Sequence, residues 1–315
     1  MNENAGPGLR FERGEQYLII LIAAVALTSA VLALVKGVEV DVAAFGFPVL
    51  FNLVFLAIGQ FYRTRRADPR IASVVTAVGL MMISGHALKL LNYLLLPYHF
   101  HGTDAFLAQA DAWMGFVWAD FVLALADYPA FCAVLKQVYL SCAWQIAGII
   151  LILGLANKTE EIARFMLAVV IGGLITIEVW TLFPSSTPAA FQALPADVAA
   201  RLGLIVSPEQ GSWLVKLSYE GLARISPDEL VGIVGFPSYH TVLALLSVWY
   251  ASKVRWLVIP IGALNVLMLP AILLHGSHNL IDVFGGICVT IASIWISSAV
   301  CAGKCAERAR LAEAA

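Results

Sequence analysis

The sequence predicts an all-α integral membrane protein, a bundle of about eight transmembrane helices. Of its 315 residues, 61% are apolar and 13% are charged, and the mean hydropathy is +0.86. Soluble domains are roughly 45–50% apolar and about 25% charged. A chain so poor in charge cannot cover a water-exposed surface with polar groups, so a soluble fold and a disordered chain are both excluded. The net charge of −2 provides no basic surface for nucleic acid.

Eight apolar stretches are long enough to cross a bilayer, whose hydrocarbon core of about 30 Å requires roughly 20 helical residues. They are Tyr17–Val35, Ala44–Phe61, Ile71–Leu96, Phe131–Ala156, Phe165–Phe183, Gly232–Ser252, Trp256–Leu274 and Asn279–Ala302. Arg10 and Arg13 precede the first stretch and no small-residue cleavage site follows it, so we expect an uncleaved span. We expect residues 1–315 to form a single integral membrane domain with its functional core at about 71–302.

The distribution of basic residues predicts that both termini are cytoplasmic. In this orientation the cytoplasmic segments hold thirteen lysines and arginines, whereas the outer segments hold four, as the positive-inside rule requires. The outer side then carries two long connections, 97–129 and 184–231. From Asp104 to Asp120, apolar and acidic residues alternate with helical spacing, which predicts amphipathic helices lying on the outer face.

Histidines are concentrated on one side of the predicted bundle. Ionisable residues within apolar stretches are costly and mark functional sites. All six histidines fall in the outer half: His86, His99, His101, His240, His275 and His278. This asymmetry places any histidine chemistry at the outer side.

Two short segments combine these histidines with further polar groups. In 235–240, Pro237 and Ser238 open a predicted helix whose free backbone N–H groups can bind an anion, and His240 lies beside them. In 275–282, His278 and Asp282 are spaced i, i+4 and so share a predicted helical face. A carboxylate that holds one imidazole nitrogen leaves the other free to attack.

Each feature alone has a structural explanation. A lone histidine near a span end is usually a packing residue, a lone i, i+4 pair can be a buried ion pair, and a helix-opening Pro-Ser is a common cap. Together, on one predicted face, they supply an anion cradle, a nucleophile with its orienting acid and a second proton donor. This conjunction favours a catalytic site.

These motifs resemble the type-2 phosphatidic acid phosphatase superfamily. Residues 236–241 read Phe-Pro-Ser-Tyr-His-Thr and residues 276–282 read Gly-Ser-His-Asn-Leu-Ile-Asp. They are most similar to the branch that includes inositol phosphorylceramide synthases and bacterial membrane proteins. The outer loop at 104–115 and the pair Tyr139 with Gln145 also look like that branch, so the likeness runs from roughly residue 100 to 290.

The resemblance implies a role for each motif residue. His278 is expected to be the nucleophile that becomes phosphohistidine, oriented by Asp282. His240 is expected to protonate the leaving alcohol and then to activate water or an acceptor hydroxyl. Ser238, Pro237 and the neighbouring backbone amides are expected to hold the phosphoryl oxygens. No metal or other cofactor is implied.

The sequence departs from the superfamily pattern at the phosphate-binding cations. The superfamily has Ser-Arg where this chain has Ala271-Ile272, and its Lys-x6-Arg-Pro motif is not found here. A bound phosphate still favours a cation, for which Lys89 is the first candidate, followed by Lys216 and Arg224 in the long outer loop. For each of these three residues taken alone, a structural role as a snorkelling side chain is favoured over a role in the site.

Two further residues are weaker candidates for the site. Glu178, near the outer end of the fifth stretch, can pair with one of the cations. His275 is the second candidate nucleophile, but it has Asn279 rather than a carboxylate four residues later.

We therefore expect a membrane enzyme that acts on lipid phosphates at the outer leaflet. The resemblance to bacterial members implies a bacterial inner membrane, with the active site facing the periplasm or exterior. A phosphatase is favoured, and the alternative is a lipid phosphotransferase that uses a lipid alcohol as acceptor. A catalytically degenerate lipid-binding protein is a second alternative, and a transporter is the least favoured.

Overall fold

The computed structural model describes residues 11–97, 100 and 102–302, and these form an all-α membrane bundle. Six helices are long and apolar enough to cross a membrane: α1 (Arg13–Lys36), α2 (Val42–Thr64), α3 (Pro69–Leu94), α8 (Thr159–Leu182), α12 (Val258–His275) and α13 (Leu280–Ala302). They match six of the eight predicted stretches to within a few residues. The predicted fold class is confirmed.

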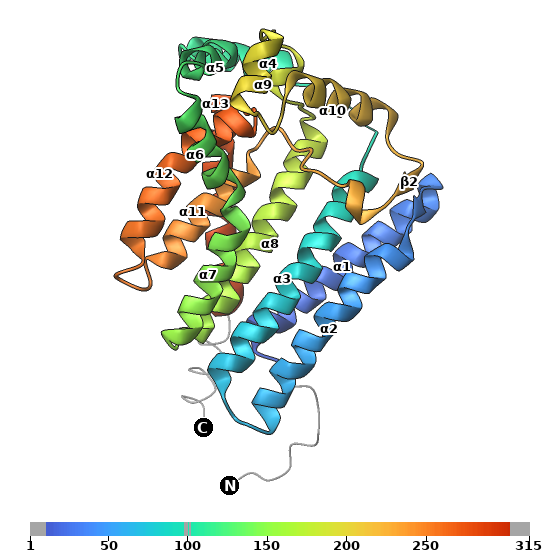
Figure 1. The fold of residues 1–315 in the computed structure, drawn as a ribbon. Helices are drawn as coiled ribbons and strands as arrows, with labels where there is room; N and C mark the ends of the chain where they lie inside the picture. The colour runs from blue at the N-terminus through green and yellow to red at the C-terminus, as the bar shows by residue number, and fades with distance from the viewer. Residues whose placement is uncertain (1–10, 98–99, 101, 303–315) are drawn as a thin grey trace.

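The other two predicted stretches fold differently from the sequence-based expectation. Phe131–Ala156 is divided at Ser141 into α6 (Pro129–Leu140) and α7 (Cys142–Leu155). Ser141 ends α6, where its backbone N–H donates to the carbonyl of Val138, three residues earlier, at 3.1 Å in place of the usual bond four residues back. The two short helices follow one another across the bundle in place of one straight span (Figure 1).

The stretch Gly232–Ser252 is helical only from α11 (Tyr239–Ala251), which has 13 residues. Its first seven residues are apolar enough to resemble a span, but they form a non-helical segment before the helix. Pro237 removes a backbone donor there, and Ser238 starts the helix as its N-cap. Ile233 is buried against Tyr93 and Trp180 in an apolar cluster near the ends of α3 and α8.

Helix α8 is the central element of the bundle. It packs against α1, α3, α7, α11 and α13, and Figure 1 shows it between the α1–α3 group and the α11–α13 group. Residues 165–170 are all buried, so this part of the helix is apolar on every side, as a fully enclosed helix must be. α8 therefore fixes the relative position of the two groups.

The connections divide the bundle into two unlike ends. The turns after α2, α7 and α11 gather at one end and carry Arg65, Arg66, Lys158, Lys253 and Arg255. The opposite end, at which α3 and α8 end and α11 and α13 begin, is called the outer end below. That the basic end is cytoplasmic remains a prediction from the charge distribution.

Short helices cover the outer end, as the amphipathic patterns predict (Figure 1). They are α4 (Asp104–Trp113), α5 (Trp118–Leu125), α9 (Ala196–Leu202) and α10 (Pro208–Glu220), with single 3-10 turns at Pro188–Ala190 (η1) and Pro227–Glu229 (η2). The strands β1 (Glu39–Val40) and β2 (Arg224–Ile225) pair in parallel beside them.

One detail of α4 differs from the expected amphipathic pattern. Asp111, expected on the polar face, is only 3% exposed, whereas Trp113, expected on the apolar face, is 74% exposed. The reversal occurs because Asp111 binds backbone groups of α13, as described next.

Candidate active site

The first histidine motif forms the start of α11. Ser238 is the N-cap, and its Oγ accepts a hydrogen bond from the Thr241 N–H at 3.4 Å. Pro237 lies before the cap rather than in the first helical turn, where the sequence placed it. The N–H of Ser238 donates to the carbonyl of Asp282 at 2.9 Å, so this motif is joined directly to the second one.

The second motif forms the turn that leads into α13. His278 precedes the helix, which begins at Leu280, so the expected shared helical face is replaced by a turn that leads into the first helical turn. Nδ1 of His278 lies 3.0 Å from Oδ2 of Asp282, and the same oxygen accepts the N–H of Asn279 at 2.9 Å. Asp282 is fully buried and His278 is 5% exposed.

This pairing sets the tautomer of His278. A carboxylate oxygen can only accept, so Nδ1 carries the proton that is shared with Asp282. Nε2 then holds a lone pair and is the nitrogen able to act as a nucleophile.

The two motifs converge on one cavity of about 490 Å³, since both His240 and His278 line it. Tyr139 of α6 lines the same wall, and its ring stacks on that of His240 with centroids 4.1 Å apart and planes at 23°. The other walls come chiefly from apolar side chains of α3, α7, α8 and α11. The cavity thus combines two imidazoles with an apolar interior.

The structure separates the three predicted cations. Lys89 of α3 lines the cavity. Lys216 is exposed on α10 and lies 3.9 Å from Glu220. Arg224 is exposed at β2 and donates to Asp41 at 2.8 Å. Neither Lys216 nor Arg224 is part of the cavity wall.

The remaining predicted phosphate ligands and the acidic partner lie outside the cavity wall. Ser238 is fully buried and Pro237 is buried where α11 meets α13, next to Gly285. Glu178 is exposed on α8, and among the described residues it forms no ion pair with any of the three cations. Their roles at a bound phosphate remain predictions.

The other histidines have separate environments. His275 is fully buried, and its Nε2 lies 2.9 Å from the carbonyl of Cys132, so the second candidate nucleophile faces α6. His86 lies on α3 with Nδ1 at 2.8 Å from the carbonyl of Met82. His99 and His101 lie outside the described residues.

Asp111 is a site residue that sequence reasoning missed. From α4, its two carboxylate oxygens accept the N–H groups of Leu280 at 2.8 Å and Ile281 at 2.9 Å. These donors are otherwise unpaired because they belong to the first turn of α13. Asp111 therefore anchors the turn that holds His278 and Asp282. Its acidic character was visible in the sequence, but no local signal linked it to a partner about 170 residues away.

The segment 185–187 was also missed, although it connects both motifs. Oγ of Ser185 accepts the N–H of Phe236 at 2.6 Å, next to the first motif. Oγ1 of Thr187 donates to the carbonyl of Ser277 at 2.8 Å, next to His278. The three residues are buried, so the two histidine motifs share one rigid support.

Asp104 binds the middle of this segment. Its Oδ1 accepts the N–H of Ser186 at 2.7 Å. Burial raises the pKa of Asp104 from its ordinary 3.8 to about 6, opposed by this hydrogen bond and reinforced by the nearby negative charge of Asp282. A carboxyl group that titrates near pH 6 therefore lies close to the active site.

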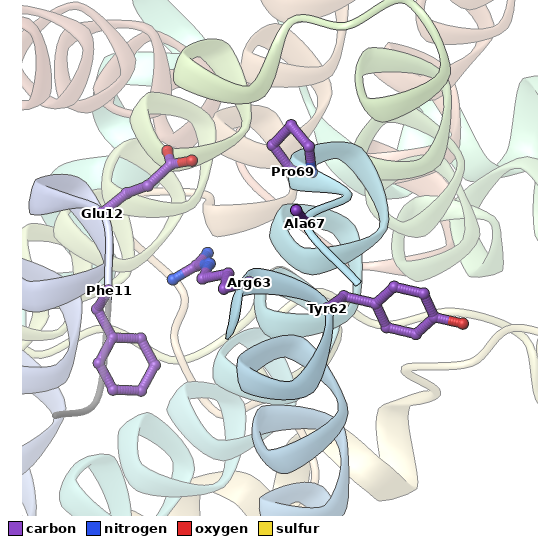
Figure 2. Close-up of a pocket in the computed structure, with 6 residues that line it drawn as sticks. All are labelled: Phe11, Glu12, Tyr62, Arg63, Ala67 and Pro69. Carbon is purple, nitrogen blue, oxygen red and sulfur yellow. The ribbon is translucent and has the colours of Figure 1, made fainter. Parts of the chain in front are cut away.

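A second cavity, of about 360 Å³, lies at the basic end of the bundle. Figure 2 shows Arg63 directed toward Phe11 and Glu12, whereas Tyr62 points away. The guanidinium of Arg63 is bound by both carboxylate oxygens of Glu15, so its charge is already compensated. No histidine lines this cavity, which separates it from the candidate site.

No group of three or more His, Cys, Asp or Glu side chains within 11–97, 100 and 102–302 is arranged to hold a metal ion. In the comparison with known proteins, a family model described as the PAP2 superfamily matches residues 105–296. This match covers more than half of the chain and includes both histidine motifs. No curated protein and no solved structure matches the chain.

Proposed function

Because the chain belongs to the PAP2 superfamily, whose members are generally phosphatases or phosphotransferases, we propose that it is a lipid-phosphate phosphatase with a phosphohistidine intermediate. One observation carries the proposal. His278, held by Asp282 with Nε2 free, lines the same cavity as a second imidazole, that of His240.

In the first step, Nε2 of His278 attacks the phosphorus atom of the ester, and the bond from phosphorus to the alcohol oxygen breaks. His240 must carry a proton in the substrate complex, and it donates this proton to the departing alkoxide, which leaves as an alcohol. Asp282 stabilises the positive charge that develops on the imidazole ring of His278. The product of this step is phosphohistidine.

In the second step, His240 takes a proton from water, whose oxygen attacks the phosphorus atom while the P–N bond breaks. This returns His278 to its starting state and releases inorganic phosphate. The negative charge on the phosphoryl oxygens requires donors and cations, and Lys89 is the cation on the cavity wall.

The apolar walls favour a lipid over a water-soluble phosphate ester. Leu88, Ile146 and Leu243 line the cavity together with the two histidines, so an acyl chain can bury apolar surface while the phosphate is held beside the imidazoles. We propose the outer leaflet for the reaction, because the site lies at the end of the bundle opposite the basic turns. The proposal of a bacterial inner membrane rests only on the likeness of the motifs to bacterial members.

A lipid alcohol that replaces water in the second step makes the same site a phosphotransferase. The likeness of residues 236–241 to inositol phosphorylceramide synthases favours this second candidate function. In that case labelled acceptor lipid carries the phosphoryl group and little free phosphate appears. A protein that only binds lipid headgroups is the third possibility, and it gives neither product.

Phosphate release from a panel of lipid phosphates in detergent tests the proposal. His278→Ala is expected to reduce turnover to background, and His240→Ala to reduce kcat by about a hundred- to ten-thousandfold through loss of general acid catalysis. His86→Ala is the matched control, since His86 is on α3 and does not line the cavity. Equal activity of wild type and His278→Ala on every substrate, with no transfer product, contradicts the proposal.

A further inference from the structure

We propose that Asn92 and Thr176, together with Lys89, form a polar subsite of the cavity that binds acceptor oxygens of the lipid headgroup. The inference rests on the proposed function in one respect, which is that the ligand is a phosphorylated lipid. The family match begins at residue 105, so Lys89 and Asn92 lie before the matched segment.

Packing of α3 against α8 brings Asn92 and Thr176 together. The two helices are in close contact where Leu88 meets Gly173, since a Cβ placed on Gly173 would lie 2.9 Å from Cδ1 of Leu88. Both helices run toward the outer end (Figure 1). One helical turn further along each, Asn92 is four residues after Leu88 and Thr176 is three after Gly173. All four residues line the cavity.

Asn92 and Thr176 are polar groups of the wall that are buried and yet lack hydrogen-bond partners. Asn92 is 7% exposed and Thr176 is 1% exposed, yet Nδ2 of Asn92 and Oγ1 of Thr176 have no hydrogen-bond partner among the described residues. By contrast, the hydroxyl of Tyr93 donates to the carbonyl of Val231 at 3.2 Å and that of Tyr239 to Val169 at 2.9 Å.

An unpartnered buried polar group is costly, and most such groups are satisfied. Helical hydroxyls of this protein usually donate to a preceding carbonyl, as Thr181 does to Ile177 and Thr290 does to Gly286. Thr176 does not follow this pattern. A ligand that supplies acceptor oxygens would satisfy it together with Asn92.

The chemistry of the ligand follows from the groups that face it. Lys89 precedes Asn92 by three residues and so lies on the same face of α3. The three side chains offer an ammonium, an amide N–H and a hydroxyl, all of which donate. They fit an anionic, oxygen-rich group, either the phosphate itself or other oxygens of the headgroup.

Thr176→Val tests the subsite, because it removes the hydroxyl while keeping the size and branching of the side chain. Thr76→Val is a matched control. Thr76 is also on a membrane helix and fully buried with an unpartnered Oγ1, but it packs against Gly59 between α2 and α3, away from the cavity. A structural role for both hydroxyls predicts equal behaviour of the two variants.

Binding is measured first in a His278→Ala background, so that the test does not depend on turnover. The probe is short-chain phosphatidic acid in detergent, and the readout is the ligand-induced rise in unfolding temperature. We expect Thr176→Val and Asn92→Leu to weaken this binding by about tenfold or more, as for loss of a hydrogen bond to a charged group. We expect Thr76→Val to bind as the parent does.

A second measurement identifies the source of the oxygens. Increased inhibition constants for inorganic phosphate in Thr176→Val show that the subsite binds the phosphoryl group. A raised KM with unchanged phosphate inhibition shows that it binds the rest of the headgroup. Either result supports the subsite. Equal affinities in Thr176→Val, Asn92→Leu and Thr76→Val overturn it, even if the enzyme hydrolyses lipid phosphates. Weakened binding in a protein without turnover refutes the proposed function alone.

Discussion

Replacing Asp111 with asparagine should perturb the position of His278, the proposed nucleophile, although Asp111 does not contact it. Asp111 accepts two backbone N–H groups in the first turn of α13, whose preceding turn contains His278. An asparagine side chain keeps one acceptor oxygen, but its NH2 group faces the second N–H, so that two donors oppose each other. The turn must shift, or one backbone N–H must lose its partner.

The magnitude follows from the bond that is lost. A hydrogen bond to a charged group contributes about 1.5–3 kcal/mol, and a buried donor left without a partner costs a similar amount. We therefore expect Asp111→Asn to cost about 2–3 kcal/mol. If all of this free energy is lost from the stabilisation of the transition state, kcat falls by about 30- to 160-fold. KM changes little, because Asp111 does not line the cavity.

The assay compares kcat and KM of Asp111→Asn with those of Asp120→Asn in the same detergent. Asp120 lies exposed on the neighbouring helix α5 and is a matched charge-removal control. Gel filtration confirms that both variants are folded. A kcat for Asp111→Asn equal to that of Asp120→Asn refutes the anchoring role. A raised KM at unchanged kcat refutes it as well.

Three further predictions concern the support and the charge of the site. Because the pKa of Asp104 is raised to about 6, its contribution to stability is present below pH 3.8 and is lost as the pH rises through 6. The loss of unfolding free energy is at most about 3 kcal/mol before solvent screening. In Asp104→Asn the unfolding temperature should not show this decline as the pH rises. Lys89→Met should raise KM for lipid phosphate by about tenfold or more, whereas Lys216→Met should leave KM unchanged in the same assay. Gly235→Ala should lose about 1–3 kcal/mol or more of unfolding free energy, because a Cβ there would overlap the backbone carbonyl oxygen of Ser186. Gly232→Ala has open space for its Cβ and should be neutral.

The apolar stretches predicted most of the helices because bilayer thickness fixes their length. The failure at Gly232–Ser252 has a physical cause. Hydropathy does not distinguish an apolar helix from an apolar extended segment that packs on other helices, as Ile233 does. Pro237 and Ser238 indicated the true start of the helix, since a proline and a capping hydroxyl mark a helix boundary.

The candidate site was predictable where its contacts are local. His278 and Asp282 are four residues apart, and their spacing indicated the hydrogen bond that the structure shows. Asp111 and Thr187 could not be found in this way, because their partners lie about 170 and 90 residues further along the chain. Contacts of this kind depend on helix packing, which hydrophobic periodicity does not determine.

The contacts of the turn before α13 also bear on how the protein is made. The hydrogen bonds of Asp104 with Ser186 and of Ser185 with Phe236 join residues that are all synthesised before His278, so they can form while the ribosome is still translating α13. Asp111 and Thr187 are also made early, but their partners lie in 277–281. His278 then completes a candidate site whose other parts are already inserted. Chains stopped before residue 276 should therefore insert stably yet be unable to form the phosphoenzyme. Adding the missing part, the turn at 276–279 with α13, as a separate polypeptide should restore phosphoenzyme labelling, and failure to restore it would contradict this order of assembly.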